Sequence, residues 1–264
     1  MHFNVPKNKT IGKYVVLFMV FVNFVIGQSS GNCLGKTQNQ YVTSGYIPAP
    51  VHKLMASNNS EKIVYLTFDD GPSSSSDKLM DLLDKYHAKA TFFLLQSNIL
   101  KHPKEVERMN LEGFSLGLHG VTHDHRKLYR SKQTVVREMS EDQKTLMNIA
   151  KIKTPFIRTP YGSYPFMKNN YRQAINKKGF IMWDWNVDSH DWKYRNWRFN
   201  QVTINQIKKL NATNQIPVIL LHDRFSTVQN IEPLLKYLEL NHYKMNGIDA
   251  TLHPLQFPVE FGKY

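Results

Sequence analysis

The 264-residue chain has a single cysteine, Cys33, and few acidic side chains relative to its basic ones. One cysteine cannot form a disulfide within the chain, so the hydrophobic core must stabilise the fold. The 34 Lys and Arg against 21 Asp and Glu give a formal net charge of +13. This charge favours an anionic partner, either nucleic acid, a membrane surface or a cell-wall polymer. The apolar fraction of 41% is ample for a packed core and argues against a disordered chain.

The sequence also lacks an uninterrupted apolar run of the ~20 residues that a membrane-spanning helix needs. Its longest run, Tyr14–Val22, follows three lysines and is soon followed by small polar residues, which is typical of an export signal. We interpret residues 1–27 as an export signal or an uncleaved membrane anchor. Residues 28–60, rich in Ser, Asn, Gln and Gly, are interpreted as a spacer and entry arm. We therefore expect a protein that is secreted or tethered at the cell wall, which argues against a nucleic-acid partner.

From residue 61 onward, short apolar strands alternate with amphipathic helices. This alternation favours parallel strands covered by helices, and the length suits a barrel somewhat smaller than the common eight-unit form. We expect one domain at 61–264, without internal repeats. Strands are expected at 63–68, 90–95, 114–118, 155–158, 180–185 and 217–221, and helices at 77–86, 103–111, 132–150, 171–178, 202–210 and 228–240.

Polar residues stand at the carboxyl ends of most of these expected strands. In a parallel barrel these ends open on one face, which is where active sites lie. We therefore expect the side chains to meet at one rim. They are Asp69 and Asp70, His119, Arg158, Asp188 and Asp191, and His222 and Asp223.

A metal site is indicated by His119 and His123, which are four residues apart. A helical turn or a tight loop would direct both imidazoles to one point, where Asp70 could complete a three-ligand divalent site. The alternative is a pair of surface histidines near His125. A bound cation would also explain why two carboxylates can be adjacent: it would bind one of them and neutralise its charge, so the two would no longer repel each other. The cation would lower the pKa of a bound water from ~15.7 toward ~7, and Asp69 would remain free as the base.

Five short motifs occur in one order between Lys62 and Leu240. Together they resemble the polysaccharide deacetylases, carbohydrate esterase family four, and in particular the peptidoglycan N-acetylglucosamine deacetylases. This resemblance implies an α/β fold, a distorted (β/α)7-type barrel with its active site at the C-terminal ends of the strands. It also implies hydrolysis of an N-acetyl group on a sugar polymer to free amine and acetate. The motifs are TFDDGP (Thr67–Pro72), HGVTH (His119–His123), RTPYG (Arg158–Gly162), DSHDW (Asp188–Trp192) and LLH (Leu220–His222).

The resemblance implies one divalent metal ion, zinc or else cobalt or nickel, bound by Asp70, His119 and His123. The sequence departs from the family's pattern at Gly120, where members commonly carry Ser or Thr. If that hydroxyl holds the metal-binding loop, the metal affinity of this chain could differ. By the same resemblance Asp69 would be the general base, and Arg158 would keep it ionised and oriented.

The remaining roles also follow from the resemblance. His222 would be the general acid, and Asp191 would hold it and favour its imidazolium form. The pocket residues would be Tyr161, whose backbone N–H stabilises the oxyanion, Trp192, which walls the pocket, and Leu220, which lines the acetyl-methyl site.

Several of these residues also have plainer interpretations. Arg158 by itself would be read as an ordinary salt-bridge arginine, and Asp188 as a brace for its own loop. Asp223 and His125 are expected to be structural. The four tryptophans could belong to the core or stack on sugar rings; they are Trp183, Trp185, Trp192 and Trp197.

We therefore expect a metal-dependent hydrolase of a non-peptide amide bond. It would remove N-acetyl groups from N-acetylglucosamine residues of a cell-wall polysaccharide, and it would work as a monomer. Peptidoglycan is the leading substrate, ahead of chitin oligomers, exopolysaccharide and acetyl-xylan. A catalytically inactive carbohydrate-binding protein would lack a ligand, base or acid, and none is missing. A metal-dependent phosphoesterase would need a second ligand cluster, which the sequence does not show.

Overall fold

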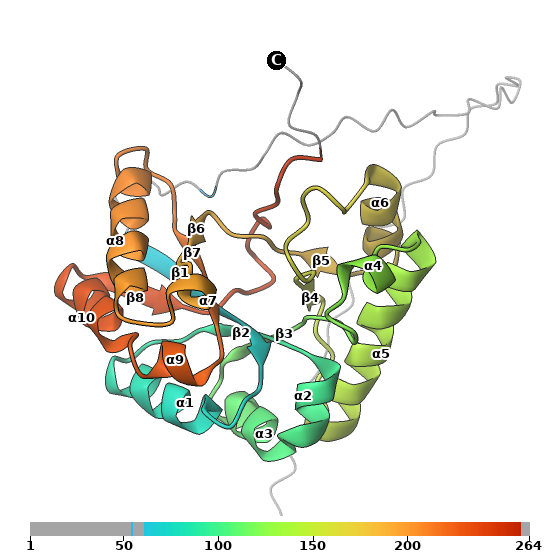
Figure 1. The fold of residues 1–264 in the computed structure, drawn as a ribbon, viewed down its shortest axis with the longest axis horizontal. Coiled ribbons are helices and arrows are strands. Elements are labelled where there is room, and N and C mark those ends of the chain that lie inside the picture. Colours follow the sequence, from blue (N-terminus) through green and yellow to red (C-terminus); the bar gives the residue numbers. More distant parts are fainter. Residues whose placement is uncertain (1–53, 55–60, 260–264) are drawn as a thin grey trace, which may run out of the picture. The chain divides into compact units, whose positions relative to one another are not determined.

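The computed structural model describes Leu54 and residues 61–259, all within the unit Pro48–Tyr264 (Figure 1). The predicted export segment 1–27 lies outside the described residues, as does the spacer 28–60 apart from Leu54. In the part that is described, no helix has both the length and the apolar character needed to cross a membrane.

A parallel sheet built around β1 (Lys62–Gly71) forms the centre of this unit. Its strands follow the order β5-β4-β3-β2-β1-β7-β6, and β8 pairs with the first half of β1. The other strands are β2 (Thr91–Leu94), β3 (Ser115–Leu118), β4 (Phe156–Ile157), β5 (Ile181–Met182), β6 (Val187–Asp188), β7 (Val218–His222) and β8 (Tyr243–Asn246).

The sheet curls into the predicted distorted (β/α)7-type barrel. Its order ends at β5 and β6, yet the chain passes from Met182 directly to Val187. A segment this short spans at most about 18 Å, so the two ends of the sheet must lie near each other. Among the described residues no strand pairing joins β5 to β6, and the barrel is therefore open at that seam.

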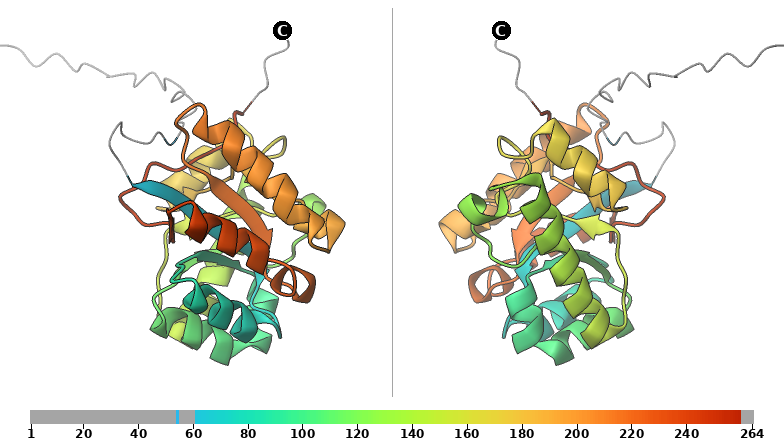
Figure 2. Two further views of the ribbon diagram at one scale, coloured as in Figure 1. Left: turned by 90° about the vertical axis from the view of Figure 1, so that its left-hand side faces the viewer. Right: turned by 90° about the vertical axis from the view of Figure 1, so that its right-hand side faces the viewer.

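Helices surround the sheet on three sides in Figure 1, with α8 and α10 on the left, α1 to α3 below, and α5 and α6 on the right; Figure 2 shows them from both flanks. This is the arrangement that alternating strands and amphipathic helices predict. The helices are α1 (Ser76–Lys85), α2 (Gln96–Lys101), α3 (Pro103–Leu111), α4 (His125–Leu128), α5 (Lys132–Ala150), α6 (Asn169–Lys177), α7 (Asp191–Tyr194), α8 (Arg198–Asn211), α9 (Phe225–Val228) and α10 (Glu232–Leu240).

The two faces of β1 belong to two different clusters, as the two-residue period of a strand requires. Val64, Leu66 and Phe68 are fully buried in the large cluster that includes the helices. Tyr65 belongs to a smaller cluster with Phe93, Phe156 and Trp183. Thr67 and Asp69 lie on the same face of β1 as Tyr65 and are also buried. This face therefore changes from apolar to polar toward the carboxyl end of the strand.

Several predicted elements are wrong in extent. β1 runs on to Gly71 rather than ending at residue 68, and α8 begins at Arg198 rather than at residue 202. The helix expected at 228–240 begins only at Glu232, with a proline in its first turn, and Val228 is the last residue of the separate short helix α9. Proline lacks the N–H that would continue a helix but is tolerated at a helix start. The expected strand at 180–185 is only Ile181–Met182, and the chain then turns to form β6.

Candidate active site

The adjacent carboxylates Asp69 and Asp70 face the same cavity, which a regular strand would not allow. Successive side chains of a strand point to opposite faces. The register between β1 and β2 shifts between Asp69 and Gly71, and Asp70 has a left-handed φ of 67°. This bulge turns the second carboxylate toward the side of the first. The end of β1 thus presents two carboxylates to one site.

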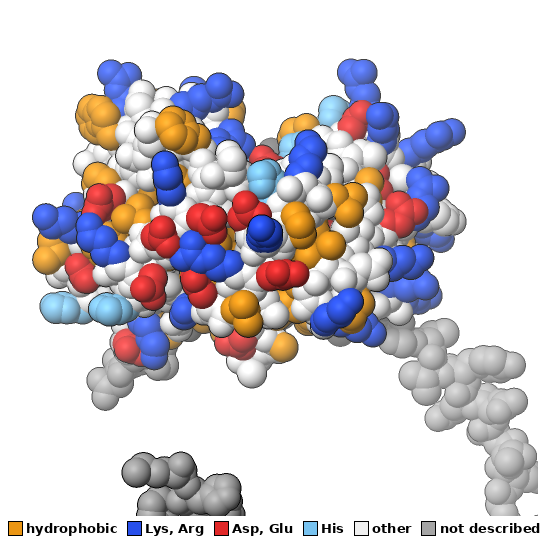
Figure 3. Space-filling model, turned by 90° about the horizontal axis from the view of Figure 1, so that it is seen from below, with side chains coloured by type: hydrophobic (Ala, Val, Ile, Leu, Met, Phe, Trp, Pro, Cys, Tyr) orange, Lys and Arg blue, Asp and Glu red, His pale blue; other side chains and the backbone are white. Residues whose placement is uncertain are grey.

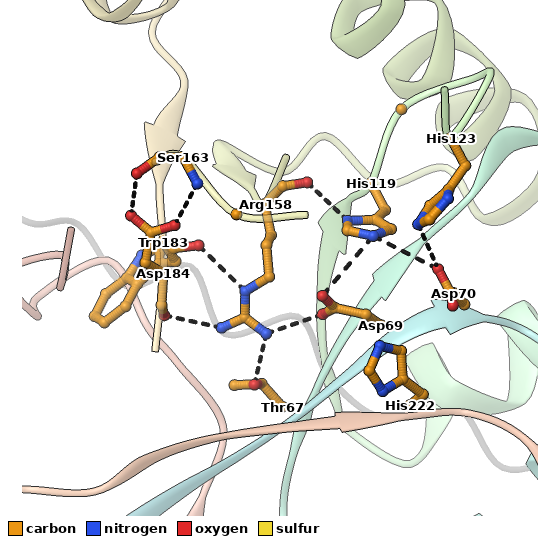
Figure 4. Close-up of polar contacts among 12 residues, drawn as sticks. Thr67, Asp69, Asp70, His119, His123, Arg158, Ser163, Trp183, Asp184 and His222 are labelled. Atoms are coloured by element: carbon orange, nitrogen blue, oxygen red, sulfur yellow. Dashed lines mark hydrogen bonds and ion pairs between the residues drawn. The ribbon is translucent and has the colours of Figure 1, made fainter. Parts of the chain in front are cut away.

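Asp70, His119 and His123 come together as the metal-ligand prediction expects (Figure 4). Asp70 Oδ1 lies 3.2 Å from His123 Nε2 and 3.6 Å from His119 Nε2, and the three ligand atoms lie within 4.8 Å of one another. Ligands about 2.1 Å from one tetrahedral ion are separated by about 3.4 Å. Asp70 Oδ1 is also buried without a hydrogen-bond donor. The donor set therefore fits a zinc-like divalent ion.

The orientation of His119 suits a ligand that uses Nε2. Its Nδ1 lies 2.8 Å from the carbonyl oxygen of Arg158, which can only accept, so Nδ1–H donates there and Nε2 is left free. Burial lowers the pKa of His119 and favours the neutral imidazole that binds metal. The chain carrying both histidines is a loop, in which Gly120 has a φ of 91° and His123 a φ of 44°.

The charges around Asp70 keep it ionised. Burial opposes this, but the nearby imidazoles of His123, His119 and His222 hold the pKa of Asp70 far below its ordinary value. Its second oxygen, Oδ2, accepts a hydrogen bond from Arg224 Nη2 at 3.0 Å. Oδ1 is thereby the oxygen that faces the two histidines.

Asp69 is paired with Arg158, a guanidinium that is completely buried (Figure 4). Arg158 Nη1 donates to Asp69 Oδ1 at 2.9 Å and to Thr67 Oγ1 at 2.6 Å. Its Nε and Nη2 donate to the carbonyl oxygens of Trp183 and Asp184, and the ring of Phe93 lies 4.3 Å away. Arg158 is thus fixed by every nitrogen, and it directs one carboxylate oxygen while leaving the other facing His119.

His222, at the end of β7, is held by Asp191. The Nδ1 of His222 lies 2.7 Å from Asp191 Oδ1, and the His222 backbone N–H donates to Oδ2 at 2.9 Å. Thr227 donates to the same Oδ2. Burial works against a charged imidazole, but Asp191 outweighs it and raises the pKa of His222. The geometry thus favours a protonated His222 whose Nε2 carries a proton to give.

The loop after β4 places the backbone of Tyr161 at the cavity. Tyr161 has a φ of 67°, and among the described residues no acceptor takes its N–H. The next residue must be glycine, because a Cβ at Gly162 would lie 2.8 Å from Trp185, and its φ is 78°. Behind the loop, Ser163 donates through both its N–H and its hydroxyl to the buried Asp184. These contacts fix the loop that carries a free N–H.

One cavity of about 380 Å³ gathers most of the predicted site residues. Arg158 and Asp191 are not in its lining and support it from behind. Trp185, Asp188 and Arg224 also line it. The predicted residues in the lining are Asp69, Asp70, His119, His123, Tyr161, Trp192, Leu220 and His222.

Arg224 was not expected at the site. It lies two residues beyond His222 in the turn after β7, and a lone arginine there carries no motif that would have revealed it.

The structure also distinguishes among the tryptophans. Trp183 is fully buried in the smaller core cluster, and Trp197 is 63% exposed outside the cavity. Trp192 and Trp185 are the two that line the cavity. Trp192 is 45% exposed and is therefore available to a sugar ring.

The residues expected to be structural have local partners. Asp188 accepts from the N–H of His190, although it also lines the cavity. Asp223 accepts from the hydroxyls of Ser73 and Ser76. His125 packs against the rings of Tyr161 and Phe166.

Comparison with known proteins gives consistent matches. The sequence model of a family described as polysaccharide deacetylase matches residues 56–183. A peptidoglycan-N-acetylglucosamine deacetylase of Bacillus cereus is 38% identical over 203 residues, which cover 76% of this chain and 73% of that protein. The crystal structure of the polysaccharide deacetylase Bc1974 from Bacillus cereus superposes with a TM-score of 0.63 at 38% identity, over 76% of this chain and 97% of that one. A Streptococcus mutans CE4 esterase superposes with a TM-score of 0.65 at 27% identity, over 72% and 87%.

Proposed function

This chain belongs to the polysaccharide deacetylase family, and on that premise we propose that it removes acetyl groups from N-acetylglucosamine residues of peptidoglycan. The choice of peptidoglycan is supported by the Bacillus cereus relative, which is named for that substrate and matches most of both chains. The exposed Trp192 at the cavity suits a sugar chain that passes over the rim.

The main support for the proposal is that three different chemical groups line the same cavity. A divalent ligand set, a carboxylate outside that set and a protonated imidazole all line it. We propose that Asp70, His119 and His123 hold one zinc ion. When bound, the zinc supplies a Lewis acid that polarises the acetyl carbonyl and acidifies water.

The protein's own groups then account for the proton transfers. Asp69 accepts a proton from the attacking water, because Arg158 binds one of its oxygens and leaves the other facing the site. The water oxygen forms a bond to the acetyl carbon, and the N–H of Tyr161 donates to the carbonyl oxygen as it gains charge. His222 Nε2 then protonates the sugar nitrogen as the carbon–nitrogen bond breaks. The products are acetate and a free amine.

One apolar residue of the cavity lining suits an acetyl group. Leu220 lies on β7, is 5% exposed and lines the cavity, so it offers an apolar contact to a methyl group. We therefore propose that acetyl is the acyl group removed.

The proposal is tested by measuring acetate release from purified peptidoglycan, chitin oligomers and acetyl-xylan side by side. We expect the highest kcat/KM on peptidoglycan, and new free amines on its glucosamine residues by mass spectrometry. A higher kcat/KM on either other polymer would overturn the substrate. An absence of acetate from all three, with protein shown to be folded, would overturn the deacetylase.

We further propose that the protein acts outside the cell. The basic and apolar pattern of residues 1–27 and the net charge of +13 support export to an anionic wall. On the face shown in Figure 3, lysine and arginine side chains are exposed along the edges and also among the Asp and Glu side chains in the middle, so an anionic polymer could reach them. Fractionation of cells that express the full chain should place it with the wall or membrane. Recovery in the cytoplasm would contradict this.

A further inference from the structure

Two acidic side chains lie on the buried face of α5, where a helix normally carries apolar residues. The face includes Val135, Met139 and Leu146, all fully buried. Glu138 and Asp142 lie between them at the same helical spacing and are 3% and 0% exposed. Acidic residues are almost never this buried unless they are paired.

The partners of these two carboxylates are four consecutive backbone N–H groups of the metal-binding loop. Asp142 Oδ2 accepts from His119 at 3.1 Å and from Gly120 at 2.9 Å. Glu138 Oε2 accepts from Val121 at 3.2 Å and from the next residue at 3.1 Å.

A fifth bond to the loop comes from a side chain. The hydroxyl of Thr122 donates to Glu138 Oε1 at 2.9 Å. The carboxylates therefore hold the entire backbone between the two histidine ligands.

Burying two acidic side chains in the core lowers the stability of the fold, so we expect them to have a role that apolar residues could not fill. Among the described residues no Lys, Arg or His forms an ion pair with Glu138 or Asp142, and Asp142 Oδ1 is buried without any donor. Two buried carboxylates one turn apart repel each other, and each loses its hydration. Apolar residues at these positions would make a less costly core, but they would leave the N–H groups of residues 120–122 unpaired. The N–H of His119 also donates to the carbonyl oxygen of Leu94 at 2.7 Å.

Other hydrogen bonds hold the start of this loop: besides the bond from the His119 N–H to Leu94 O, Gly120 O accepts from the Gln96 N–H at 3.0 Å. Gly120 and His123 have left-handed φ values, so no regular ladder runs through it. We propose that Glu138 and Asp142 are positioning residues of the metal centre. By holding the backbone of residues 119–122 they set the directions of the two imidazoles toward Asp70 Oδ1. This inference rests on the metal site of the proposed function, but not on the identity of the substrate.

The test replaces both carboxylates by their isosteric amides, Glu138→Gln with Asp142→Asn. An amide oxygen keeps the shape and can accept the same N–H groups, but bonds to a neutral acceptor are about half as strong. Partners of metal-ligating residues typically change metal affinity by about 10–100-fold when mutated. We expect the zinc Kd of this double variant, measured by competition with a chelating dye, to rise at least about tenfold. The visible spectrum of its cobalt-loaded form should also shift, because the ligand directions relax.

The matched control is Glu141→Gln, which removes a carboxylate from the same helix. The Glu141 side chain is 46% exposed and lies 3.9 Å from Arg137, away from the loop. Its zinc Kd and cobalt spectrum should equal those of the parent. A purely structural role would lower the melting temperature of the metal-free protein without altering either readout in the folded protein.

The alanine variants Glu138→Ala and Asp142→Ala extend the series. Where they fold, we expect a larger loss of zinc affinity than for the amides, so that affinity falls in the order parent, amide, alanine. Where they do not fold, the amide pair decides. A zinc Kd and a cobalt spectrum unchanged from the parent in the amide pair would overturn the inference. Zinc binding by the parent without acetate release from any substrate would instead overturn the deacetylase proposal, and the zinc Kd of the amide pair would still decide this inference.

Discussion

Replacing Asp191 by Asn should move the pH dependence of the enzyme, because Asp191 is the charge that raises the pKa of His222. The carboxylate receives three hydrogen bonds, from His222 Nδ1, the His222 backbone N–H and Thr227. A hydrogen bond to a charged group contributes about 1.5–3 kcal/mol. The neutral amide should therefore lower the pKa of His222, and each loss of about 1.4 kcal/mol reduces the population of its imidazolium form about tenfold.

The sign of the effect follows from the role of His222 as an acid. The imidazolium form is needed, so kcat falls as pH rises through its pKa. In Asp191→Asn this alkaline limb should lie at lower pH than in the parent. Above the parent's limb, kcat should be about 10–100-fold lower than in the parent.

The assay is acetate release at saturating substrate from pH 5 to pH 10. The control is Thr227→Val, which removes a hydroxyl from the same carboxylate without removing its charge. The control should not lower the alkaline limb, since Asp191 loses a donor and becomes a stronger partner for His222. An alkaline limb at the same pH in Asp191→Asn and the parent would refute His222 as the acid held by Asp191.

Three further substitutions test other parts of the site. Asp69→Asn should retain zinc by elemental analysis and lose about 10²–10⁴-fold in kcat, and near-normal turnover would exclude Asp69 as the base. Arg158→Met leaves a buried carboxylate unpaired and should lower the free energy of unfolding in urea by about 3–5 kcal/mol, whereas a loss under 1 kcal/mol would contradict the buried pair. Gly162→Ala forces a Cβ to within 2.8 Å of Trp185 and should lower kcat/KM with zinc content unchanged, because the N–H of Tyr161 moves; an unaltered kcat/KM would count against that N–H.

The sequence predicts the regular parts of the fold well, and the reasons are physical. The helices at 103–111 and 132–150 have the predicted bounds, since both show strong periodicity, the first opening on a proline and the second capped by Ser131. The start of α10 was predicted four residues too early, because the apolar periodicity begins before Glu232. The strand β8, Tyr243–Asn246, was also missed, because four mixed residues pair with β1 only through contacts distant in sequence.

The site shows a similar division. The motif residues were found from the sequence because they stand at strand ends. The structure brings most of them to one cavity, with Arg158 and Asp191 behind its lining, and their chemical roles stay predictions. Asp69 and Asp70 both point into that cavity because of a bulge in β1, and residue spacing alone does not reveal that bulge. The acidic residues on α5 did leave a signal. Glu138 and Asp142 occupy apolar positions in the periodicity of that helix, which marks a buried polar contact.

The most direct test of the central claim is a zinc titration of the chelated, inactive protein, with acetate release as the readout. The account predicts that activity returns in proportion to added zinc and reaches its plateau at one ion per chain. The same titration should restore nothing in His119→Ala or Asp70→Ala. Full activity in the thoroughly chelated protein, or a plateau that needs two ions per chain, would contradict a single ion held by Asp70, His119 and His123.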